Sequence, residues 1–208
     1  MISKIDWQEF EKFSASCREK HIPVVRRQTA ELLCDMVQKK APQNILELGT
    51  AVGYSGSLML LSSPKSRLKT VDINSQMCDL AKQTFLKYNV ADRAEIICDD
   101  ILSYLETETQ QFDFIFLDGP KGQYIKYLPH LKRLIKSGGI IFCDDVLYFG
   151  MVMDDSKVIH KKITIVRNLR EFISKCQQDT DFETELLDME DGVLILRKKW
   201  LVKRWLIK

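Results

Sequence analysis

Short apolar segments alternate regularly with amphipathic ones between residues 43 and 143, and this rhythm constrains the fold more than any other feature. Five segments have the length and composition of buried strands, at 44–48, 68–71, 94–98, 112–117 and 140–143, and the last follows an expected turn at "KSGG". Segments with helical spacing follow the first two, from about residue 55 and over 75–88. Strands that alternate with helices pair in parallel, and their crossovers are right-handed. The pattern therefore predicts an α/β fold with helices on both faces of a mostly parallel sheet.

The two ends of the chain depart from this rhythm. Residues 5–40 have apolar side chains at helical spacing, with a break at "HIPVV". The stretch "FETELLDMEDGVLILRKK" reads as two strands joined by a short turn at Asp191 and Gly192, which predicts an antiparallel hairpin at one sheet edge. With 208 residues, we expect one domain. It would consist of a helical cap over 1–42, a core over 43–198 and a basic tail over 199–208.

Composition indicates a globular chain, with 45% apolar and 29% charged residues. No apolar run reaches the roughly 18 residues of a membrane span, and the N-terminus carries charges where a signal peptide needs an apolar core. We therefore expect a cytoplasmic protein without a membrane span. The last twelve residues hold six basic residues and no acid, whereas the rest carries a net charge of −4. This end is either a solvated terminus or an arm that binds phosphates or a membrane surface.

Acidic residues collect where the predicted strands end. They are Asp72, Asp99, Asp100, Asp118, Asp144 and Asp145. In open α/β sheets, ligands bind beyond the carboxyl ends of the strands, so these side chains should share one crevice. Their charges would repel each other unless a cation lies among them. A metal ion would meet that need, and so would S-adenosylmethionine, which carries a sulfonium and whose ribose suits Asp72.

The first predicted strand runs into the sequence "LELGTAVGYSG". Glu47, Gly49, Gly53 and Ser55 mark a glycine-bearing turn into a helix, where the backbone can approach a ligand and offer free N–H groups. The spacing is neither that of a dinucleotide fingerprint nor that of a phosphate loop. Taken alone, the segment is either a cofactor loop or a tight strand–helix turn.

Three motifs in order, "LELGTAVGYSG", "LDGPKGQY" and "FCDDV", resemble those of the cation-dependent O-methyltransferases of the catechol and caffeoyl-CoA type. These enzymes are class I methyltransferases that use S-adenosylmethionine. The resemblance covers about residues 20–198. It implies a Rossmann-like, seven-stranded sheet and a homodimer.

The resemblance also implies a role for individual residues. The positions that match cofactor contacts are Val25, Glu47, Gly49, Ser55, Asp72, Asp99, Asp100 and Asp118. Those that match ligands of Mg²⁺ or Mn²⁺ are Asp118, Asp144 and Asp145, and Lys121 matches the catalytic base. One position departs from the family pattern, which has asparagine where this chain has Asp145. A third carboxylate should tighten cation binding and weaken the cation's Lewis acidity.

The sequence leaves the substrate open. A catechol offers two adjacent hydroxyls, and a 5-hydroxyuridine offers its hydroxyl beside a ring carbonyl. The segments "KGQY" and "GMV" resemble bacterial members that methylate 5-hydroxyuridine in tRNA, and we expect that substrate first. Basic residues near the C-terminus could add phosphate contacts, namely Lys198, Lys199, Lys203 and Arg204. The alternatives are a small catechol-like or phenolic substrate and, in another class, a non-catalytic domain that binds cofactor or RNA.

Overall fold

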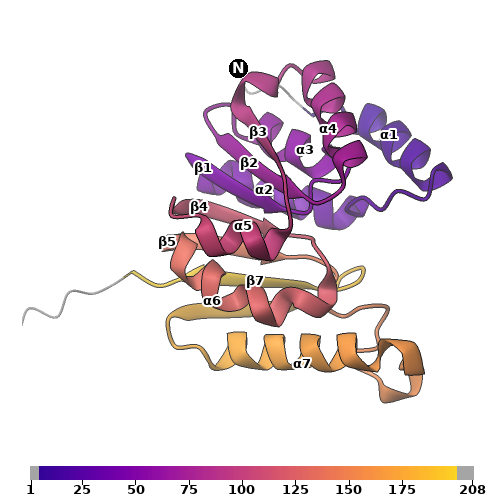
Figure 1. The fold of residues 1–208 in the computed structure, drawn as a ribbon, viewed down its shortest axis with the longest axis vertical. Helices are drawn as coiled ribbons and strands as arrows, with labels where there is room; N and C mark the ends of the chain where they lie inside the picture. Colours follow the sequence, from indigo (N-terminus) through magenta and orange to yellow (C-terminus); the bar gives the residue numbers. More distant parts are fainter. Residues whose placement is uncertain (1–4, 201–208) are drawn as a thin grey trace, which may run out of the picture.

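The computed structural model describes residues 5–200, and within them seven strands form one sheet in the order β3-β2-β1-β4-β5-β7-β6 (Figure 1). The strands are β1 (Asn44–Leu48), β2 (Arg67–Asp72), β3 (Ala94–Cys98), β4 (Phe112–Leu117), β5 (Ile135–Cys143), β6 (Phe182–Leu187) and β7 (Val193–Lys198). The first five are parallel, and β7 pairs antiparallel with both β5 and β6. The expected fold class is confirmed: a Rossmann-like, mostly parallel sheet with an antiparallel hairpin at its C-terminal edge.

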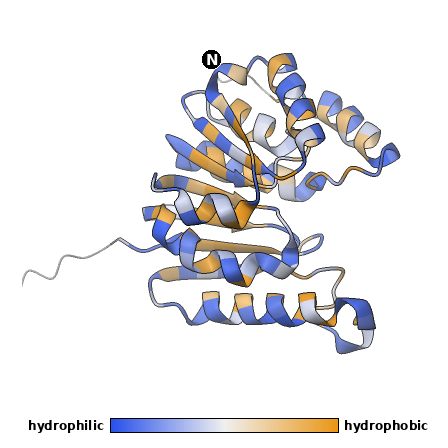
Figure 2. Cartoon of the chain, in the orientation of Figure 1, coloured by the Kyte–Doolittle hydropathy of each residue, from blue (hydrophilic) through white to orange (hydrophobic). Residues whose placement is uncertain are grey.

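Seven α-helices in this part of the chain cover the two faces of the sheet. They are α1 (Trp7–Glu19), α2 (Arg27–Lys40), α3 (Tyr54–Ser62), α4 (Ser75–Lys87), α5 (Ile101–Thr107), α6 (Tyr124–Leu134) and α7 (Ile163–Gln178). Helices α1 to α4 share one apolar cluster, and α5 to α7 share the other. Alternation along β4 feeds both clusters, since Phe114 and Phe116 join the first, and Ile115 and Leu117 join the second. Apolar residues accordingly concentrate on the strands and the inward helix faces (Figure 2).

Local sequence signals explain several helix starts. The side chains of Asp6, Asn74 and Asp100 each accept hydrogen bonds from backbone N–H groups in the first turn of α1, α4 and α5. Such caps satisfy donors that have no partner within the helix. Among residues 5–200, no helix has the length and apolarity needed to cross a membrane.

Most predicted element bounds agree with the structure, and β1, β3 and β4 agree at both ends. Strand β5 is an exception, because it begins at Ile135 rather than at Ile140. The segment "KSGG" was expected to be a turn. It continues the strand through an irregularity in register, in which Ile135 pairs with Phe112 and Ile140 pairs with Phe114. Gly138, with φ of 73°, accommodates the distortion.

The sheet topology brings the ends of β1, β4 and β5 together. The chain reverses its direction of winding between β1 and β4, which is where open α/β sheets bind ligands. Gly49 makes the close approach possible. It has φ of +112°, and a Cβ at this position would lie 2.4 Å from the carbonyl oxygen of Asp118. A glycine is therefore required here by backbone packing, whatever else the loop binds.

The C-terminal strand ends on the side of the sheet where the parallel strands begin, away from their carboxyl ends. Strand β7 runs antiparallel to β5, so it ends at Lys198 beside the start of β5. The Lys198 ammonium donates to the carbonyl oxygens of Lys132 and Ile135, and Trp200 lies against Gly138. Most of the predicted basic tail, with Lys203, Arg204, Trp205 and Lys208, lies outside the described residues.

Candidate active site

A cavity of about 890 Å³ opens above the carboxyl ends of the parallel strands. It is lined by nine of the residues that the sequence singled out, namely Val25, Gly49, Ser55, Asp72, Asp100, Asp118, Lys121, Asp144 and Asp145. These residues come from the α1–α2 connection, from the loops at the ends of β1, β2, β4 and β5, from the first turn of α3 and from the cap of α5. The fold thus collects in one place side chains that are up to 120 positions apart in sequence.

Three carboxylates cluster at one end of the cavity, which we call its acidic end. Asp118, Asp144 and Asp145 each offer an oxygen atom within 4.8 Å of those of the other two. Asp144 is 3% exposed. Burial raises its pKa well above the ordinary range, and the charges on Asp118 and Asp145 raise it further. Oxygen donors of this kind suit a hard divalent cation such as Mg²⁺ or Mn²⁺.

Lys121 is the cation that faces this cluster within the described residues. Its Nζ lies 2.5 Å from Asp118 Oδ1 and 3.8 Å from Asp145 Oδ2. Burial alone would lower the pKa of Lys121, but the charge of Asp118, with further contributions from Tyr124, Asp145 and Asp144, raises it well above its ordinary value. Within the described residues, Lys121 is the one cation paired with these carboxylates within 4 Å, and Arg26 acts on Asp145 from a greater distance. A divalent cation would fit the remaining charge.

The position of Lys121 follows from the turn after β4. Pro120 precedes a short 3₁₀ helix, η2 (Lys121–Gln123), that leads directly into α6. The buried Tyr124 phenol accepts a hydrogen bond from Lys121 Nζ at 3.0 Å and lies within donor distance of the Leu117 and Asp144 carbonyl oxygens. The lysine is thereby fixed between α6 and the strand ends.

Asp72 and Asp100 define the other end of the cavity. Asp72 Oδ2 accepts a hydrogen bond from Ala51 N at 2.8 Å, and its Oδ1 accepts one from Asn74 N at 2.9 Å. Asp72 is therefore held by the loop that follows β1 as well as by its own turn. Asp100 caps α5 through the N–H groups of Leu102 and Ser103. Both carboxylates are oriented by the backbone before any ligand binds.

Two predicted cofactor contacts, Glu47 and Asp99, do not line the cavity. Glu47 is fully buried, and it accepts hydrogen bonds from Ser55 Oγ at 2.5 Å and Thr70 Oγ1 at 2.6 Å. Burial raises the pKa of Glu47 to about 8. Its carboxyl group ties β1 to β2 and α3. Asp99 is exposed, and its Oδ1 accepts a hydrogen bond from Asp100 N. Contact of either residue with a cofactor stays a prediction.

The cavity also contains residues that the sequence did not single out. They are chiefly Arg18, Arg26, Arg27, Phe149 and Glu190. Three arginines, from α1, the α1–α2 connection and the first position of α2, line the cavity, and each guanidinium lies within 3.8 Å of a carboxylate oxygen of Glu11, Glu31 or Asp191. Glu190 belongs to the hairpin turn between β6 and β7. Phe149 follows the motif "FCDDV" by three residues, whereas the other four lie far from the three motifs in sequence. The local signals for those four were only the pair "RR" at 26–27 and the acidic turn "MEDG".

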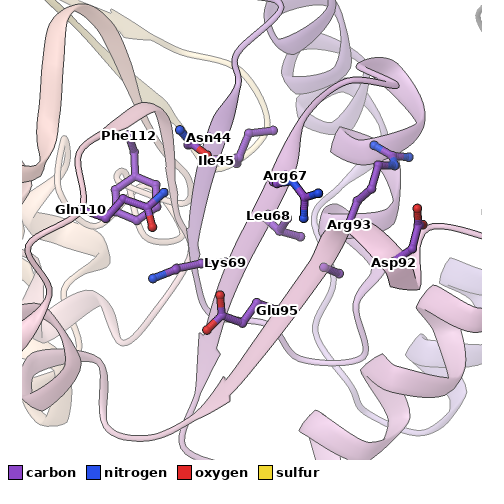
Figure 3. A pocket seen from close by; sticks show the side chains of 11 residues that line it. Asn44, Ile45, Arg67, Leu68, Lys69, Asp92, Arg93, Glu95, Gln110 and Phe112 are labelled. Carbon is purple, nitrogen blue, oxygen red and sulfur yellow. The ribbon is translucent and has the colours of Figure 1, made fainter.

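A second cavity, of about 180 Å³, lies at the opposite edge of the sheet, near the starts of β1, β2 and β3 (Figure 3). Arg93 lines it but donates to the carbonyl oxygens of Leu60, Ser63 and Ser66. Lys69 lines it too, and its ammonium lies 2.8 Å from a carboxylate oxygen of Glu108. Arg93 and Lys69 therefore stabilise the fold through these contacts, and the acidic cavity remains the candidate active site.

Comparison with known proteins decides the family. The sequence profile described as O-methyltransferase matches residues 7–199. The chain belongs to the O-methyltransferase family. This O-methyltransferase is 30% identical over 164 residues to a catechol O-methyltransferase of Niastella koreensis, covering 76% of this chain and 71% of that protein. It is 29% identical over 168 residues to caffeoyl-CoA O-methyltransferase 1 of Eucalyptus globulus, covering 75% and 67%.

A solved structure agrees with this assignment. The O-methyltransferase from Bacillus cereus in complex with SAH superposes with a TM-score of 0.79 at 25% identity, covering 94% of this chain and 93% of that chain. The family and fold expected from the three motifs are confirmed. The protein is an O-methyltransferase that uses S-adenosylmethionine.

Proposed function

We propose that this O-methyltransferase methylates one hydroxyl of a substrate that carries two neighbouring oxygens, with a divalent cation held by Asp118, Asp144 and Asp145. The observation that carries the proposal is the three-carboxylate cluster, which has a single lysine to oppose it at one end of a large cavity. A bound cation would lower the pKa of the substrate hydroxyl and fix its direction. The donor set fits Mg²⁺ or Mn²⁺.

The chain's own residues supply binding, orientation and proton transfer. Asp72 is placed to accept hydrogen bonds from ribose hydroxyls at the far end of the cavity from the carboxylate cluster. Lys121 is placed to take the proton of the reacting hydroxyl, once the charges that raise its pKa are balanced. Most of the acceleration would come from holding oxygen and methyl carbon in attack geometry. Departure of the methyl group leaves the cofactor's sulfur neutral.

The first candidate substrate is a small catechol-like phenol. A catechol O-methyltransferase and a caffeoyl-CoA O-methyltransferase are among the relatives, and each name describes a substrate that can carry two adjacent oxygens. The cavity wall formed by the segment after β5 includes Phe149, whose ring suits contact with an aromatic substrate. The test is methylation of 3,4-dihydroxybenzoate by the purified enzyme with S-adenosylmethionine and Mg²⁺, followed by mass spectrometry. If the enzyme forms no methylated product from this or any other catechol, the small phenolic substrate is excluded.

The second candidate is 5-hydroxyuridine in tRNA, which the sequence favoured. The observation that supports it is the set of three partly exposed arginines that line the cavity, Arg18, Arg26 and Arg27, because guanidinium groups bind phosphates. The described start of the basic tail gives it less support, since Trp200 lies beside Gly138, at the other end of β5 from Asp144. Mass spectrometry of tRNA nucleosides from a strain lacking the gene would decide. Accumulated 5-hydroxyuridine would select tRNA over a small phenol.

Truncation tests the tail directly. Deleting residues 201–208 spares β7 and Trp200 and removes Lys203, Arg204 and Lys208. If these cations touch RNA, tRNA affinity should fall and the plot of log affinity against log salt should flatten by about one to three units of slope. Methylation of a free catechol should not change. An unchanged salt slope in a filter-binding titration would show that the tail does not contact RNA.

Asp145 and Asp118 should respond differently to neutralisation. Asp145→Asn restores the residue of the family pattern, and we expect it to keep most activity while weakening metal affinity. Asp118→Asn should lose far more activity, because Asp118 lies closest to Lys121. Calorimetric titration with Mn²⁺ and steady-state kinetics measure the two effects. An equal collapse of activity in both variants would show that Asp145 has a function beyond replacing asparagine.

We further propose that the enzyme forms a homodimer, as the family resemblance implies. Light scattering during size-exclusion chromatography would then give about twice the chain mass of 24.2 kDa. A mass equal to one chain would contradict this.

A further inference from the structure

The turn between β6 and β7 contacts two segments on either side of the cavity's acidic end: the start of α2 and the segment that follows β5. We call these two segments the walls. Two acids of the turn contact distant segments: Asp191 contacts one more than 40 residues away in sequence, and Glu190 contacts one more than 160 residues away. No motif marks them, and the chemistry proposed above does not use them. Asp191 nevertheless contacts two residues that line the cavity, Phe149 and Arg26, and Glu190 lines the cavity itself.

Asp191 holds the segment that follows the carboxylate cluster. Its side chain is 5% exposed, and Oδ1 accepts a hydrogen bond from the backbone N–H of Phe149. Its carbonyl oxygen accepts one from Leu147 N at 2.8 Å, and that of Gly192 accepts one from Val146 N at 3.0 Å. Three backbone donors between residues 146 and 149 are therefore satisfied by a single two-residue turn.

The segment held in this way is conformationally unfavourable. Asp145, Tyr148 and Phe149 have φ of 53°, 48° and 58°, in the left-handed region that side chains other than glycine rarely occupy. Such conformations persist where surrounding contacts enforce them, and they concentrate at functional sites. The Phe149 ring lines the cavity and is 66% exposed, so little packing fixes it. Within the described residues, the Asp191 carboxylate is the side chain that accepts a hydrogen bond from the backbone N–H of Phe149.

The same turn also holds the opposite wall. Helix α2 follows Arg26, which provides no side-chain cap, and Glu190 supplies one instead. Its carboxylate accepts hydrogen bonds from Gln28 N at 3.2 Å, Thr29 N at 2.9 Å and Thr29 Oγ1 at 2.6 Å. The second oxygen of Asp191 lies 3.8 Å from the Arg26 guanidinium. The turn therefore joins the start of α2 to the segment after β5.

We propose that Asp191 is a positioning residue for methyl transfer: through the Phe149 amide and the Arg26 guanidinium, it sets the spacing of the two walls between which the substrate binds. The inference rests on the proposed function, because it assigns these walls to the substrate. It does not require Asp191 to touch the substrate. A loss of this contact should loosen substrate placement while the cofactor end, formed around Asp72, stays unchanged.

The test compares Asp191→Ala with Asp191→Asn, which keeps an oxygen acceptor for the Phe149 amide. With 3,4-dihydroxybenzoate as the probe, Asp191→Ala should lower kcat/KM by about 10²-fold, mainly through KM, because small misplacements cost this much. Affinity for S-adenosylmethionine, measured by calorimetry, should change by less than about twofold. Asp191→Asn should recover part of the loss. Hydrogen exchange of a peptide covering 146–150 should accelerate at least about tenfold in Asp191→Ala, with the strands of the sheet still protected.

Asp113→Ala is the matched control. Asp113 also accepts hydrogen bonds from two backbone N–H groups, those of Gln43 and Asn44, and it pairs with Lys136. It lies near the start of β4, whereas the cavity lies beyond the carboxyl ends of the strands. The Asp113→Ala substitution should lower the melting temperature without raising KM. Unchanged exchange over 146–150 in folded Asp191→Ala would overturn the proposal, and so would an equal rise of KM in Asp113→Ala. If the wild-type enzyme does not methylate catechols, the proposed substrate fails, while the exchange experiment still decides whether Asp191 holds this segment.

Discussion

Removal of divalent cations is expected to abolish methyl transfer, and addition of Mg²⁺ or Mn²⁺ is expected to restore it. Asp118, Asp144 and Asp145 place three carboxylates within reach of one ion, and Lys121 opposes them with a single charge. Without the ion, the substrate hydroxyl would lose both its orientation and the lowering of its pKa. The measurement is product formation after dialysis against excess EDTA, followed by titration with each metal. Full activity in excess chelator would contradict the proposed chemistry.

The same cluster predicts a pH-dependent effect on stability that does not involve catalysis. The pKa values of Asp144 and Asp145 are raised in the folded protein, Asp144 most strongly, because burial and neighbouring carboxylates penalise their charged forms. The folded state therefore holds these protons more tightly than the unfolded chain, so the free energy of unfolding of the metal-free protein should fall as pH rises above the ordinary aspartate pKa. A cation that binds the ionised cluster should reverse this loss.

The increase in melting temperature on adding Mg²⁺ should therefore be larger at about pH 8 than at about pH 5, where protons compete for the same oxygens. Asp144→Asn provides the control, since it removes a buried carboxylate of nearly the same shape and should abolish most of the increase. An equal increase in the wild-type and Asp144→Asn proteins would place the cation elsewhere.

The parts of this structure that sequence predicts well are those governed by local pattern. Strands β1, β3 and β4 were located at both ends, because each is a short apolar run bounded by polar or turn-forming residues. Five of the six acidic residues expected in one crevice line the cavity, because parallel strands present their carboxyl ends together, and Asp99 does not line it. The start of β5 was missed because "KSGG" has the composition of a turn, and only pairing with Phe112 extends the strand through it.

Other features depend on contacts between distant segments, and sequence pattern does not encode them. The contact of Glu47 with the cofactor stays a prediction, whereas its hydrogen bonds with the hydroxyls of Ser55 and Thr70 inside the core could not be read from the sequence. Asp191 was expected only as part of a hairpin turn, because its partners, Phe149 and Arg26, belong to segments that only the folded chain brings together. A glycine-rich motif thus predicts where a cofactor loop begins, whereas the direction of each side chain is set by tertiary packing.

Replacing Lys121 by alanine is expected to lower kcat by about 10²- to 10⁴-fold, the range typical of a lost general base. Lys121 is fixed by Tyr124 and Asp118 at the carboxylate cluster, so its amine faces the reacting end of the cavity. Affinity for S-adenosylmethionine should scarcely change, because Asp72 and Ser55 lie at the other end. Steady-state kinetics at saturating cofactor and Mg²⁺, together with calorimetry, separate the two quantities.

Lys121→Arg distinguishes proton transfer from simple charge balance. Arginine keeps a positive charge opposite Asp118 but does not give up its proton in the accessible pH range. If Lys121 accepts the substrate's proton, both variants should be slow, and their kcat should rise with pH by about tenfold per unit as ionisation of the substrate in solution replaces the missing base. A nearly normal rate for Lys121→Arg would mean that the lysine only balances the carboxylates. A nearly normal rate for Lys121→Ala at neutral pH would mean that the cation ionises the hydroxyl without help from a side chain.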